Sequence, residues 1–377
     1  MPQDNGYQEG NQVILLQSGS DFFNRLFLRL SEAKRFIHIH IYILGHDKTG
    51  LEVLRLLKEA AARGVQVYLL VDQFGSPWLT VSCARELSLD SLHIKRFARR
   101  VSYKRLTLGR RQHAKVCIVD NELAFISGLN YADRYSGLDG QEPWLDYGVE
   151  VQGPIVGTIN HRAAIYWPRK IQQRIRSFKG TGRRGEVSCR LSWNDWLRNR
   201  FQISRSYRKR IQEAQEEIIL VVSYFYPSPR MLRLIMKRAK EGVKVKVFLS
   251  RRSDVPFMRA AMNYFYSGLL RNGAEIYEWD RSILHAKLLL VDGRWASVGS
   301  YNLNQLSDYG SLEANLEVQG PLIEEWRQSL LDELTQGSAH VTTSRGGILR
   351  RLGQLFSFLL IRLALKVLFL RRTLVDL

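Results

Sequence analysis

One short pattern occurs twice in this chain, and its repetition restricts the fold to a duplicated one. The first copy is His113-Ala-Lys115-Val-Cys-Ile-Val-Asp120, and the second is His285-Ala-Lys287-Leu-Leu-Leu-Val-Asp292. The two histidines are 285 − 113 = 172 positions apart, which is about half of the 377 residues. We therefore expect two similar halves that meet at a two-fold-like interface, with both histidines in one pocket.

Each copy of the motif reads as a β-strand. Side chains alternate between the two faces of a strand, so each motif histidine and its lysine should point the same way. The aliphatic residues that follow should be buried. Asp120 and Asp292 lie an odd number of residues from their histidine, at the strand end. We therefore interpret them as turn or scaffold carboxylates rather than as partners of the same histidine.

The segments that follow the two motifs also correspond. Ser127-Gly128-Leu-Asn130 follows the first motif, and Gly299-Ser300-Tyr-Asn302 follows the second. The exchange of Ser and Gly between the copies weakens a hydroxyl role for Ser127 but leaves Asn130 in place. We predict that Asn130, Asn302, Ser300 and Ser127 bind a substrate phosphate.

This doubled constellation resembles the phospholipase D superfamily, whose signature is His-x-Lys-x4-Asp followed by a Gly/Ser-x-Asn element. The resemblance covers most of residues 15–325. It implies a nucleophilic histidine, for which His113 is the expected candidate, and a general acid/base, for which His285 is expected. The near symmetry of the two copies does not itself distinguish these roles.

An acidic residue should orient each histidine, as the third member of a catalytic triad does. Aligning the two repeats after the motifs pairs Asp146 with Glu313, and the superfamily tends to carry an acidic residue at about this place. Asp146 and Glu313 are therefore the expected partners. Glu150 and Glu317 are second choices, because the strand phrase that contains them looks structural.

The residue types suit metal-free cleavage of a phosphodiester. One histidine can attack phosphorus and the other can protonate the leaving alkoxide, while two lysines neutralise the non-bridging oxygens. The lysines supply the charge that Mg²⁺ provides in other enzymes, so we expect no cofactor and no metal. The predicted catalytic residues are His113, Lys115, Asp120, Asp146, His285, Lys287, Asp292 and Glu313.

Within the superfamily the chain is most similar to bacterial cardiolipin synthases, through Leu284–Asp292, Gly299–Asn302, Leu312–Glu317 and Trp144–Asp146. The resemblance implies transfer of a phosphatidyl group from one phosphatidylglycerol to another, with release of glycerol. Hydrolysis of a phospholipid by a phospholipase D reaction and a metal-independent nuclease remain alternatives. A nuclease could stack bases on aromatic residues such as Tyr103 and Tyr207. A non-catalytic membrane scaffold would leave both motifs without a purpose.

The net charge of +20 favours a polyanionic partner, either an anionic phospholipid surface or, as the less favoured candidate, nucleic acid. The three scattered cysteines indicate a reducing compartment, and Cys117 should be a small buried residue. The polar start of the chain has no signal-peptide pattern. The expected location is the cytoplasmic face of the bacterial inner membrane, with peripheral attachment.

Alternating strand and helix patterns predict an α/β fold with two tandem phospholipase D-like α/β/α domains related by pseudo-two-fold symmetry. We expect these domains at residues 13–180 and 181–335, after a disordered lead-in over residues 1–12. Two basic segments, 97–111 and 198–210, could contact phosphates or could be solvated loops.

A third region, residues 346–377, is expected to form a basic amphipathic helix that associates with a membrane. Its longest uncharged run, Leu352 to Ile361, has ten residues, and a spanning helix needs about 20. Arg351, Arg362 and Lys366 fall on one helical face, opposite a face of leucine, phenylalanine and valine. The alternative is a helix docked on the protein's own core.

Overall fold

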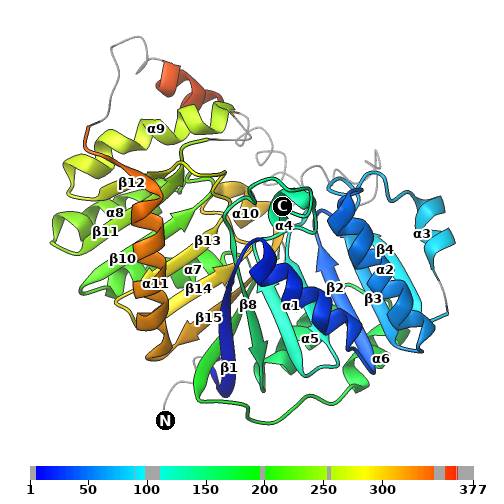
Figure 1. Cartoon of the computed structure of the whole chain (residues 1–377). Helices are drawn as coiled ribbons and strands as arrows, with labels where there is room; N and C mark the ends of the chain where they lie inside the picture. The colour runs from blue at the N-terminus through cyan, green and yellow to red at the C-terminus, as the bar shows by residue number, and fades with distance from the viewer. Residues whose placement is uncertain are drawn as a thin grey trace, which may run out of the picture. The chain divides into compact units, whose positions relative to one another are not determined.

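The computed structural model describes residues 6–88, 90–97, 111–195, 200–252, 256–343, 353–361 and 363. The chain has a mixed α/β fold, as predicted, and divides into two compact units (Figure 1). Unit 1 contains Met1–Trp193, Ser297–Ser300 and Leu312–Gly320. Unit 2 contains Asn194–Ala296, Tyr301–Ser311 and Pro321–Leu377. Two short pieces of the second half of the sequence thus belong to unit 1. The domain boundaries expected from the sequence stay a prediction.

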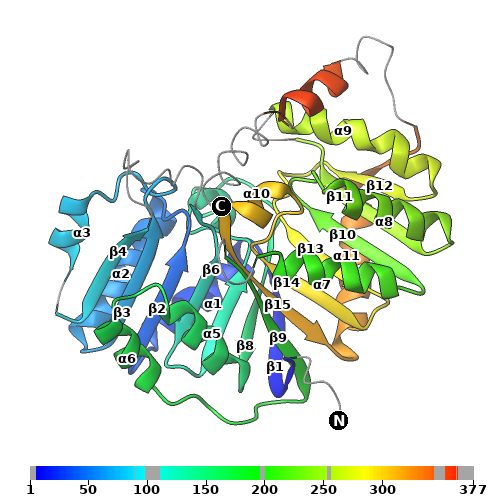
Figure 2. The ribbon, with the colours of Figure 1, turned by 180° about the vertical axis from the view of Figure 1, so that it is seen from behind.

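Unit 1 is built on a twisted sheet with the strand order β15-β9-β1-β8-β7-β6-β2-β3-β4, and β5 pairs with β15. Helices α1 and α2 cover one face, as Figure 1 shows, and α5 and α6 cover the other, as Figure 2 shows. The strands are β1 Gln8–Gln17, β2 Phe36–Ile41, β3 Gln66–Asp72, β4 Leu92–Phe97, β5 Arg111–Gln112, β6 Lys115–Val119, β7 Leu123–Ser127, β8 Tyr147–Gln152, β9 Val187–Asn194 and β15 Ser311–Gln319. The helices are α1 Ser20–Ser31, α2 Lys48–Ala62, α3 Val81–Leu87, α4 Asp133–Ser136, α5 Ile155–Ala164 and α6 Arg169–Ser177.

Unit 2 is also built on a sheet, with the strand order β16-β12-β11-β10-β13. Strand β14, Trp295–Gly299, begins in unit 2 and ends in unit 1. The other strands are β10 Glu217–Val222, β11 Lys244–Ser250, β12 Glu275–Trp279, β13 Lys287–Val291 and β16 Ser338–Val341. The helices are α7 Gln202–Glu213, α8 Pro229–Lys240, α9 Pro256–Arg271, α10 Gln305–Tyr309 and α11 Leu322–Gln336.

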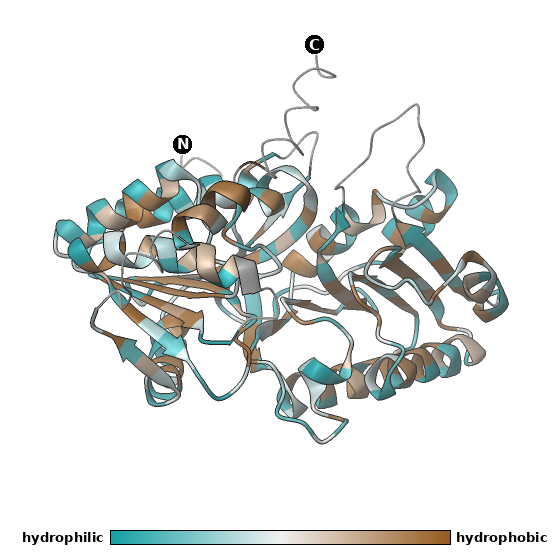
Figure 3. Cartoon of the chain, turned by 90° about the horizontal axis from the view of Figure 1, so that it is seen from above, coloured by the Kyte–Doolittle hydropathy of each residue, from teal (hydrophilic) through white to brown (hydrophobic). Residues whose placement is uncertain are grey.

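The hydrophobic core of unit 1 forms between the apolar residues of its strands and those of helices α1 and α2. In Figure 3 the hydrophobic residues gather in the strands, while the helices carry both hydrophobic and hydrophilic residues. Alternate residues of β2, such as Ile37 and Ile39, pack with leucines of α1 and α2 and are fully buried. Cys117, which was expected to be a small buried residue, belongs to this same cluster. Burial of these apolar surfaces is the main source of stability of the fold.

The other face of β2 carries a buried polar layer. His38 and His40 alternate with the isoleucines and are fully buried. His38 Nδ1 lies 3.1 Å from Asn160 Oδ1, and its Nε2 accepts a hydrogen bond from the Trp167 indole at 3.0 Å. The two imidazole rings contact each other through Nε2 at 3.1 Å. Burial lowers the pKa of His38 to about 4, so this pair is neutral and structural at neutral pH.

The motif aspartates hold the turns that precede the central strands. Asp120 accepts hydrogen bonds from the backbone N–H groups of Lys34, Arg35 and Phe36 at 2.6–2.9 Å. Asp292 does the same for the N–H groups of residues 215–217 at 2.8–2.9 Å. Both aspartates adopt a positive φ, 55° and 52°. This geometry is that of a scaffold carboxylate, and each set of three hydrogen bonds lies within one unit.

The prediction of a disordered lead-in over residues 1–12 was wrong for residues 8–12. Strand β1 begins at Gln8, inside the expected lead-in of residues 1–12, and it pairs antiparallel with β8 and β9. The side chain of Asn11 is fully buried, donates to the carbonyls of Gln8 and Val187, and accepts from the N–H of Ile155. Neighbouring strands supply the hydrogen bonds, so a polar sequence without alternation forms a strand here.

Within the described ranges, no helix has both the length and the apolar character needed to cross a bilayer. The C-terminal segment contains a helix over residues 353–361, which we call the tail helix, and residue 363 is also helical. The tail helix appears in red beside α9 in Figure 1.

Candidate active site

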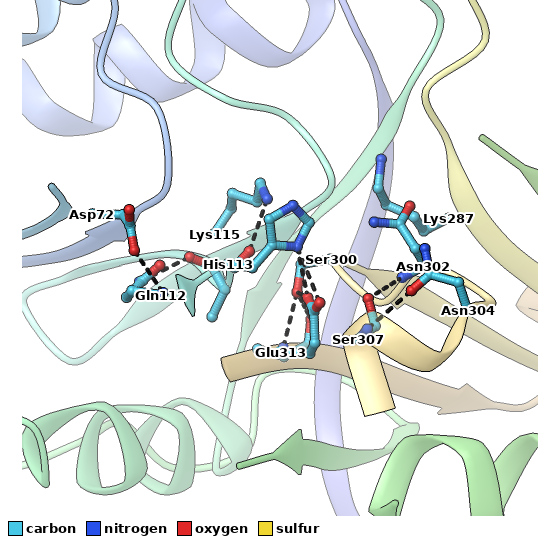
Figure 4. Close-up of polar contacts among 12 residues, drawn as sticks. Asp72, Gln112, His113, Lys115, Lys287, Ser300, Asn302, Asn304, Ser307 and Glu313 are labelled. Atoms are coloured by element: carbon cyan, nitrogen blue, oxygen red, sulfur yellow. Dashed lines mark hydrogen bonds and ion pairs between the residues drawn. The ribbon is translucent and has the colours of Figure 1, made fainter. Parts of the chain in front are cut away.

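The first motif histidine has a carboxylate partner that comes from the second repeat of the sequence. His113 Nδ1 lies 2.9 Å from Glu313 Oε2 and 3.1 Å from Oε1 (Figure 4). Strand β15 brings Glu313 here, because the N–H of His113 donates to the carbonyl of Leu312 at 3.0 Å. The carboxylate is fully buried, whereas 16% of the His113 side chain is exposed. All of these residues belong to unit 1.

This contact fixes the chemistry of the imidazole. A carboxylate only accepts hydrogen bonds, so the proton of a neutral His113 is on Nδ1 and the lone pair is on Nε2. The ring also lies edge-on to Tyr42 at 5.1 Å between centroids. A histidine held in this tautomer by a buried carboxylate can act as a nucleophile, because the carboxylate stabilises the cation that forms.

Ser300 orients the same carboxylate. Its hydroxyl donates to Glu313 Oε2 at 2.6 Å and accepts from the N–H of Ala314 at 3.0 Å (Figure 4). Gly299 is required beside it, because a Cβ there would lie 2.2 Å from the carbonyl oxygen of Ala314. Ser300, which was predicted to bind phosphate, therefore contacts the carboxylate that holds His113.

Lys115 lies beside the same histidine. Its Nζ donates to the carbonyl of His113 at 2.8 Å and lies 5.3 Å from the centre of the Tyr42 ring. Only 2% of Lys115 is exposed. A buried ammonium at this position can attract a phosphate oxygen more strongly than it would in water.

Asp72 positions the segment that carries His113, and the sequence analysis missed it. Its carboxylate is fully buried and accepts from the N–H of Gln112 at 2.9 Å (Figure 4). It also accepts from the N–H groups of Phe74 at 2.8 Å and Gly75 at 3.1 Å. Burial raises the pKa of the Asp72 carboxyl. In the second repeat Ser250 has this role, since its hydroxyl accepts from the N–H of Leu284 at 2.9 Å. The sequence does carry a signal, because Asp72 and Ser250 each end the strand that follows a glycine at the end of a helix, Gly64 and Gly242.

The remaining predicted residues of unit 1 are tightly packed. Asp146 is fully buried, its Oδ1 accepts from the N–H of Tyr147 at 2.8 Å, and its own N–H donates to the Ser18 hydroxyl at 3.1 Å. A Cβ on Gly128 would lie 2.5 Å from the Asp146 carboxylate oxygens. The Ser/Gly exchange between the repeats therefore follows from the carboxylates, since Gly128 leaves space where Ser300 donates a hydrogen bond.

Asn130 is used within the fold. Its Oδ1 accepts from the N–H of Ile43 at 3.1 Å, and its Nδ2 donates to the Tyr135 hydroxyl at 2.9 Å. Ser127 is 2% exposed and faces Lys115 across the β6–β7 pair. Asn130 thus ties the segment after β2 to the segment after β7, close to the first motif.

The second motif belongs to unit 2. Lys287 Nζ lies 2.7 Å from His285 Nδ1 and also donates to the His285 carbonyl. His285 is 6% exposed, and its ring lies edge-on to Tyr224 at 6.3 Å between centroids. Asn302 is 7% exposed, and its N–H contacts the Ser307 hydroxyl at 3.3 Å. Within the described residues, Asn302 Oδ1 has no hydrogen-bond partner.

The second-choice carboxylates have structural partners. Glu150 forms ion pairs with Arg25 and Arg29, both at 3.2 Å, and Glu317 pairs with Arg190 at 2.8 Å. Both glutamates are 1% exposed. Glu150 thus links β8 to α1, and Glu317 links β15 to β9.

One of the two aromatic residues that could stack on a nucleic-acid base is buried. Tyr207 is 2% exposed and packs against the rings of Trp295 and Tyr301, so it is not available for stacking on a base. Tyr103 and most of the basic segment 97–111 lie outside the described residues, as do residues 198 and 199 of the second basic segment. Within the described part, helix α7 forms most of that second segment.

Comparison with known proteins agrees with the doubled motif. The family model "Cardiolipin synthase, PLD-like domain" matches residues 26–142 and 207–335, which is more than half of the chain. Both motifs lie inside the matched ranges. The solved structure of a phosphatidylserine synthase from Haemophilus influenzae Rd KW20 has the same fold, with a TM-score of 0.71 over 95% of this chain and 94% of that chain, at 15% identity.

Curated relatives cover most of this sequence. It is 32% identical over 336 residues to cardiolipin synthase B of Salmonella typhi, spanning 87% of this chain and 81% of the relative. It is also 32% identical over 339 residues to cardiolipin synthase B of Escherichia coli K12, spanning 87% of this chain and 80% of the relative. The chain therefore belongs to the cardiolipin synthase family of phospholipase D-like proteins.

Proposed function

We propose that this protein is a phosphatidyltransferase that makes cardiolipin from two molecules of phosphatidylglycerol and releases glycerol. The observation that carries the proposal is the buried Glu313 carboxylate on His113 Nδ1, in a chain with two motifs of this family. That contact leaves the nucleophilic lone pair on Nε2, as covalent catalysis on phosphorus requires. The relatives that are 32% identical to this chain over 87% of its length carry the name cardiolipin synthase B.

In the first step of the proposed reaction, His113 Nε2 attacks the phosphorus of phosphatidylglycerol. The bond from phosphorus to the glycerol oxygen breaks, and His285 gives a proton to the departing glycerol. The product is a phosphatidyl group on His113. Lys115 and Lys287 neutralise the non-bridging oxygens, and the Asn302 amide donates a further hydrogen bond.

In the second step, His285 takes a proton from a hydroxyl of a second phosphatidylglycerol. The oxygen of that hydroxyl attacks the phosphorus and breaks the bond to His113, which yields cardiolipin. Glu313 stabilises the positive charge of the phosphohistidine and Ser300 orients Glu313. By the repeat alignment, Asp146 is the proposed partner of His285. Asp120 and Asp292 support the turns, and Asp72 supports the strand that leads into His113.

The experiment that tests this function uses pure protein, mixed micelles of phosphatidylglycerol and, separately, a single-stranded oligonucleotide. Mass spectrometry should find cardiolipin and glycerol in equal amounts and an intact oligonucleotide. His113→Ala should abolish the product, and His340→Ala, an exposed histidine of β16, should not. Phosphatidic acid as the main product would mean hydrolysis, and cleaved oligonucleotide would mean a nuclease; either would contradict the proposal.

A substrate with a good leaving group separates the roles of the two histidines. Phosphatidyl-p-nitrophenol needs no protonation of its leaving group, so His285→Gln should still release about one equivalent of nitrophenolate in a burst. The phosphatidyl adduct should be found on the tryptic peptide that contains His113. His113→Gln should show no burst. An adduct on the His285 peptide of the unaltered protein would reverse the assignment.

We further propose that the protein works as a peripheral protein at the cytoplasmic face of the bacterial inner membrane, where it reaches anionic phospholipid. The net charge of +20 supports attraction to such a surface. The proposed reaction uses no metal or other cofactor, because Lys115 and Lys287 supply the positive charge.

A further inference from the structure

The tail helix presents a contiguous apolar face to solvent. Phe356, Leu359 and Leu360 of the tail helix are exposed by 66%, 49% and 45%, and Leu363, which is also helical, by 59%. Their spacing of i, i+3, i+4 and i+7 places all four on one side of a helix. Four large apolar side chains exposed side by side are unusual on a soluble surface and mark a site of interaction.

The opposite side of the tail helix packs against α9, within unit 2. Phe358 stacks on Tyr264 at 4.6 Å between ring centroids and also contacts Phe265, and both of these residues lie on α9. The backbone carbonyl of Phe358 accepts a hydrogen bond from the Tyr226 hydroxyl at 3.0 Å. Ser357 is 8% exposed. The helix is thus held by one face while the other face stays open.

Tyr226 connects this helix to the second motif within unit 2. Its N–H donates to the carbonyl of Leu303 at 3.1 Å, directly after Asn302. Three residues earlier, the N–H of Ser223 donates to the carbonyl of Ala286 at 2.9 Å, directly after His285. The segment 223–226 therefore contacts both the motif strand and the helix that carries the exposed apolar face.

The first repeat has no such connection at the corresponding position. There the N–H of Gly45 donates to the carbonyl of Tyr131 at 2.7 Å, directly after Asn130, so Gly45 corresponds to Tyr226. A glycine has no side chain to hold a helix. The tyrosine is therefore specific to the repeat on which the tail helix docks.

We propose that the exposed face of the tail helix binds an anionic lipid surface and that Tyr226 and Phe358 fix this contact next to the second motif. Residues 345–372 contain seven basic residues and no acidic residue, which favours anionic lipid over a neutral apolar partner. The inference rests on the proposed function, because phosphatidylglycerol is both the surface and the substrate. It explains how a chain without a spanning helix in its described part would reach lipid beside His285.

The first test replaces the exposed face in a Phe356→Ser, Leu359→Ser, Leu360→Ser and Leu363→Ser variant. Co-sedimentation with phosphatidylglycerol vesicles should fall at least tenfold, and cardiolipin formation on those vesicles should fall with it. Formation in detergent micelles should stay within twofold, because micelles present dispersed lipid and no extended bilayer on which the helix must hold the protein. Leu28→Ser with Leu51→Ser, two exposed leucines of α1 and α2, is the matched control and should bind as the parent does.

The second test separates binding from positioning. Phe358→Ala should sediment with vesicles as the parent does but make cardiolipin on them about tenfold more slowly, with micelle turnover unchanged. Equal loss of vesicle binding in Phe358→Ala and in the fourfold variant would refute separate roles for the two faces.

Three results would overturn the lipid surface itself. They are unchanged sedimentation of the fourfold variant, equal binding to phosphatidylcholine vesicles, and a parent dimer in light scattering that the fourfold variant cannot form. The last would assign the face to a second copy of this chain. Sedimentation does not need turnover, so a failure of the proposed function would remain distinguishable from a failure of this inference.

Discussion

At the scale of single residues, two differences between the repeats concern the immediate surroundings of the motif histidines. Position 128 is glycine and position 300 is serine, because the first lies against the Asp146 carboxylate and the second donates to the Glu313 carboxylate. Asp72 holds the residue before His113, where Ser250 holds the residue before His285. These exchanges make the two histidines chemically different within a duplicated frame.

The partner of His113 gives the first prediction. Glu313→Gln keeps the size of the side chain and a hydrogen-bond acceptor but removes the charge that stabilises a cationic imidazole. We expect cardiolipin formation in micelles to fall by about 10³- to 10⁴-fold, because replacing a triad carboxylate by its amide lowers turnover by about 10⁴-fold. Glu325→Gln, an exposed residue of α11, is the control and should change nothing. Full activity of Glu313→Gln would remove Glu313 from the site.

The buried histidine pair of β2 gives a prediction about stability and pH. The pKa of His38 is about 4 in the folded state and about 6.5 in an unfolded chain, so the unfolded state binds more protons between these values. Stability should therefore be complete above pH 6.5 and fall as the pH drops towards 4, by about 3 kcal/mol for His38 alone. Burial lowers the pKa of His40 as well, which acts in the same direction.

Urea unfolding at pH 7, 6 and 5 measures this effect. His38→Gln should flatten the dependence, because glutamine can still contact Asn160 and Trp167 but does not titrate. His340→Gln should leave the dependence as it is. An equal slope for His38→Gln and the parent would show that other groups control the acid sensitivity.

At the scale of elements, the sequence pattern predicts which segments are helices or strands and approximately where each begins and ends. The apolar spacing over residues 51–63 indicates a helix, and α2 spans Lys48–Ala62; the apolar run over residues 217–223 indicates a strand, and β10 spans Glu217–Val222. Apolar periodicity and the stop glycines suffice where a helix or a buried strand forms its own pattern. They do not suffice for β1, where Gln8–Gln12 is polar and the neighbouring strands supply the hydrogen bonds.

Asp120 and Asp292, which hold the turns before β2 and β10, give a prediction about stability. Asp120→Asn and Asp292→Asn each exchange an acceptor oxygen for an amide that cannot accept, so at least one backbone N–H loses its charged partner. We expect each variant to lose roughly 1–3 kcal/mol of unfolding free energy. Activity per folded molecule should stay within about threefold. Asp332→Asn, an exposed residue of α11, should not change stability.

Unfolding by urea and circular dichroism would measure the loss in these variants. If a natively folded Asp120→Asn or Asp292→Asn protein has no activity, then the aspartate takes part in catalysis directly. If both variants behave alike, the two repeats use one construction for the turn.

At the scale of the whole molecule, the net charge of +20 makes attraction to anionic lipid sensitive to salt. Raising NaCl from about 0.05 to 0.5 M shortens the screening length from about 14 to about 4 Å. Binding to phosphatidylglycerol vesicles should fall at least tenfold, as flotation can measure. Turnover in micelles of a neutral detergent should change less. Salt-independent binding would mean that the apolar face of the tail helix alone provides the affinity.

The sequence by itself determined the duplication, the α/β class, the motif residues and the amphipathic character of the tail, because each is written in local spacing and periodicity. Only the tertiary structure decided that Glu313 partners His113, since β15 runs beside the segment that carries His113, 200 positions away in the sequence. It also decided that Asp72 supports the motif and that Phe358 docks while Phe356 is exposed. Hydrogen-bond partners distant in sequence depend on which strands become neighbours, and a single chain's local pattern does not specify this.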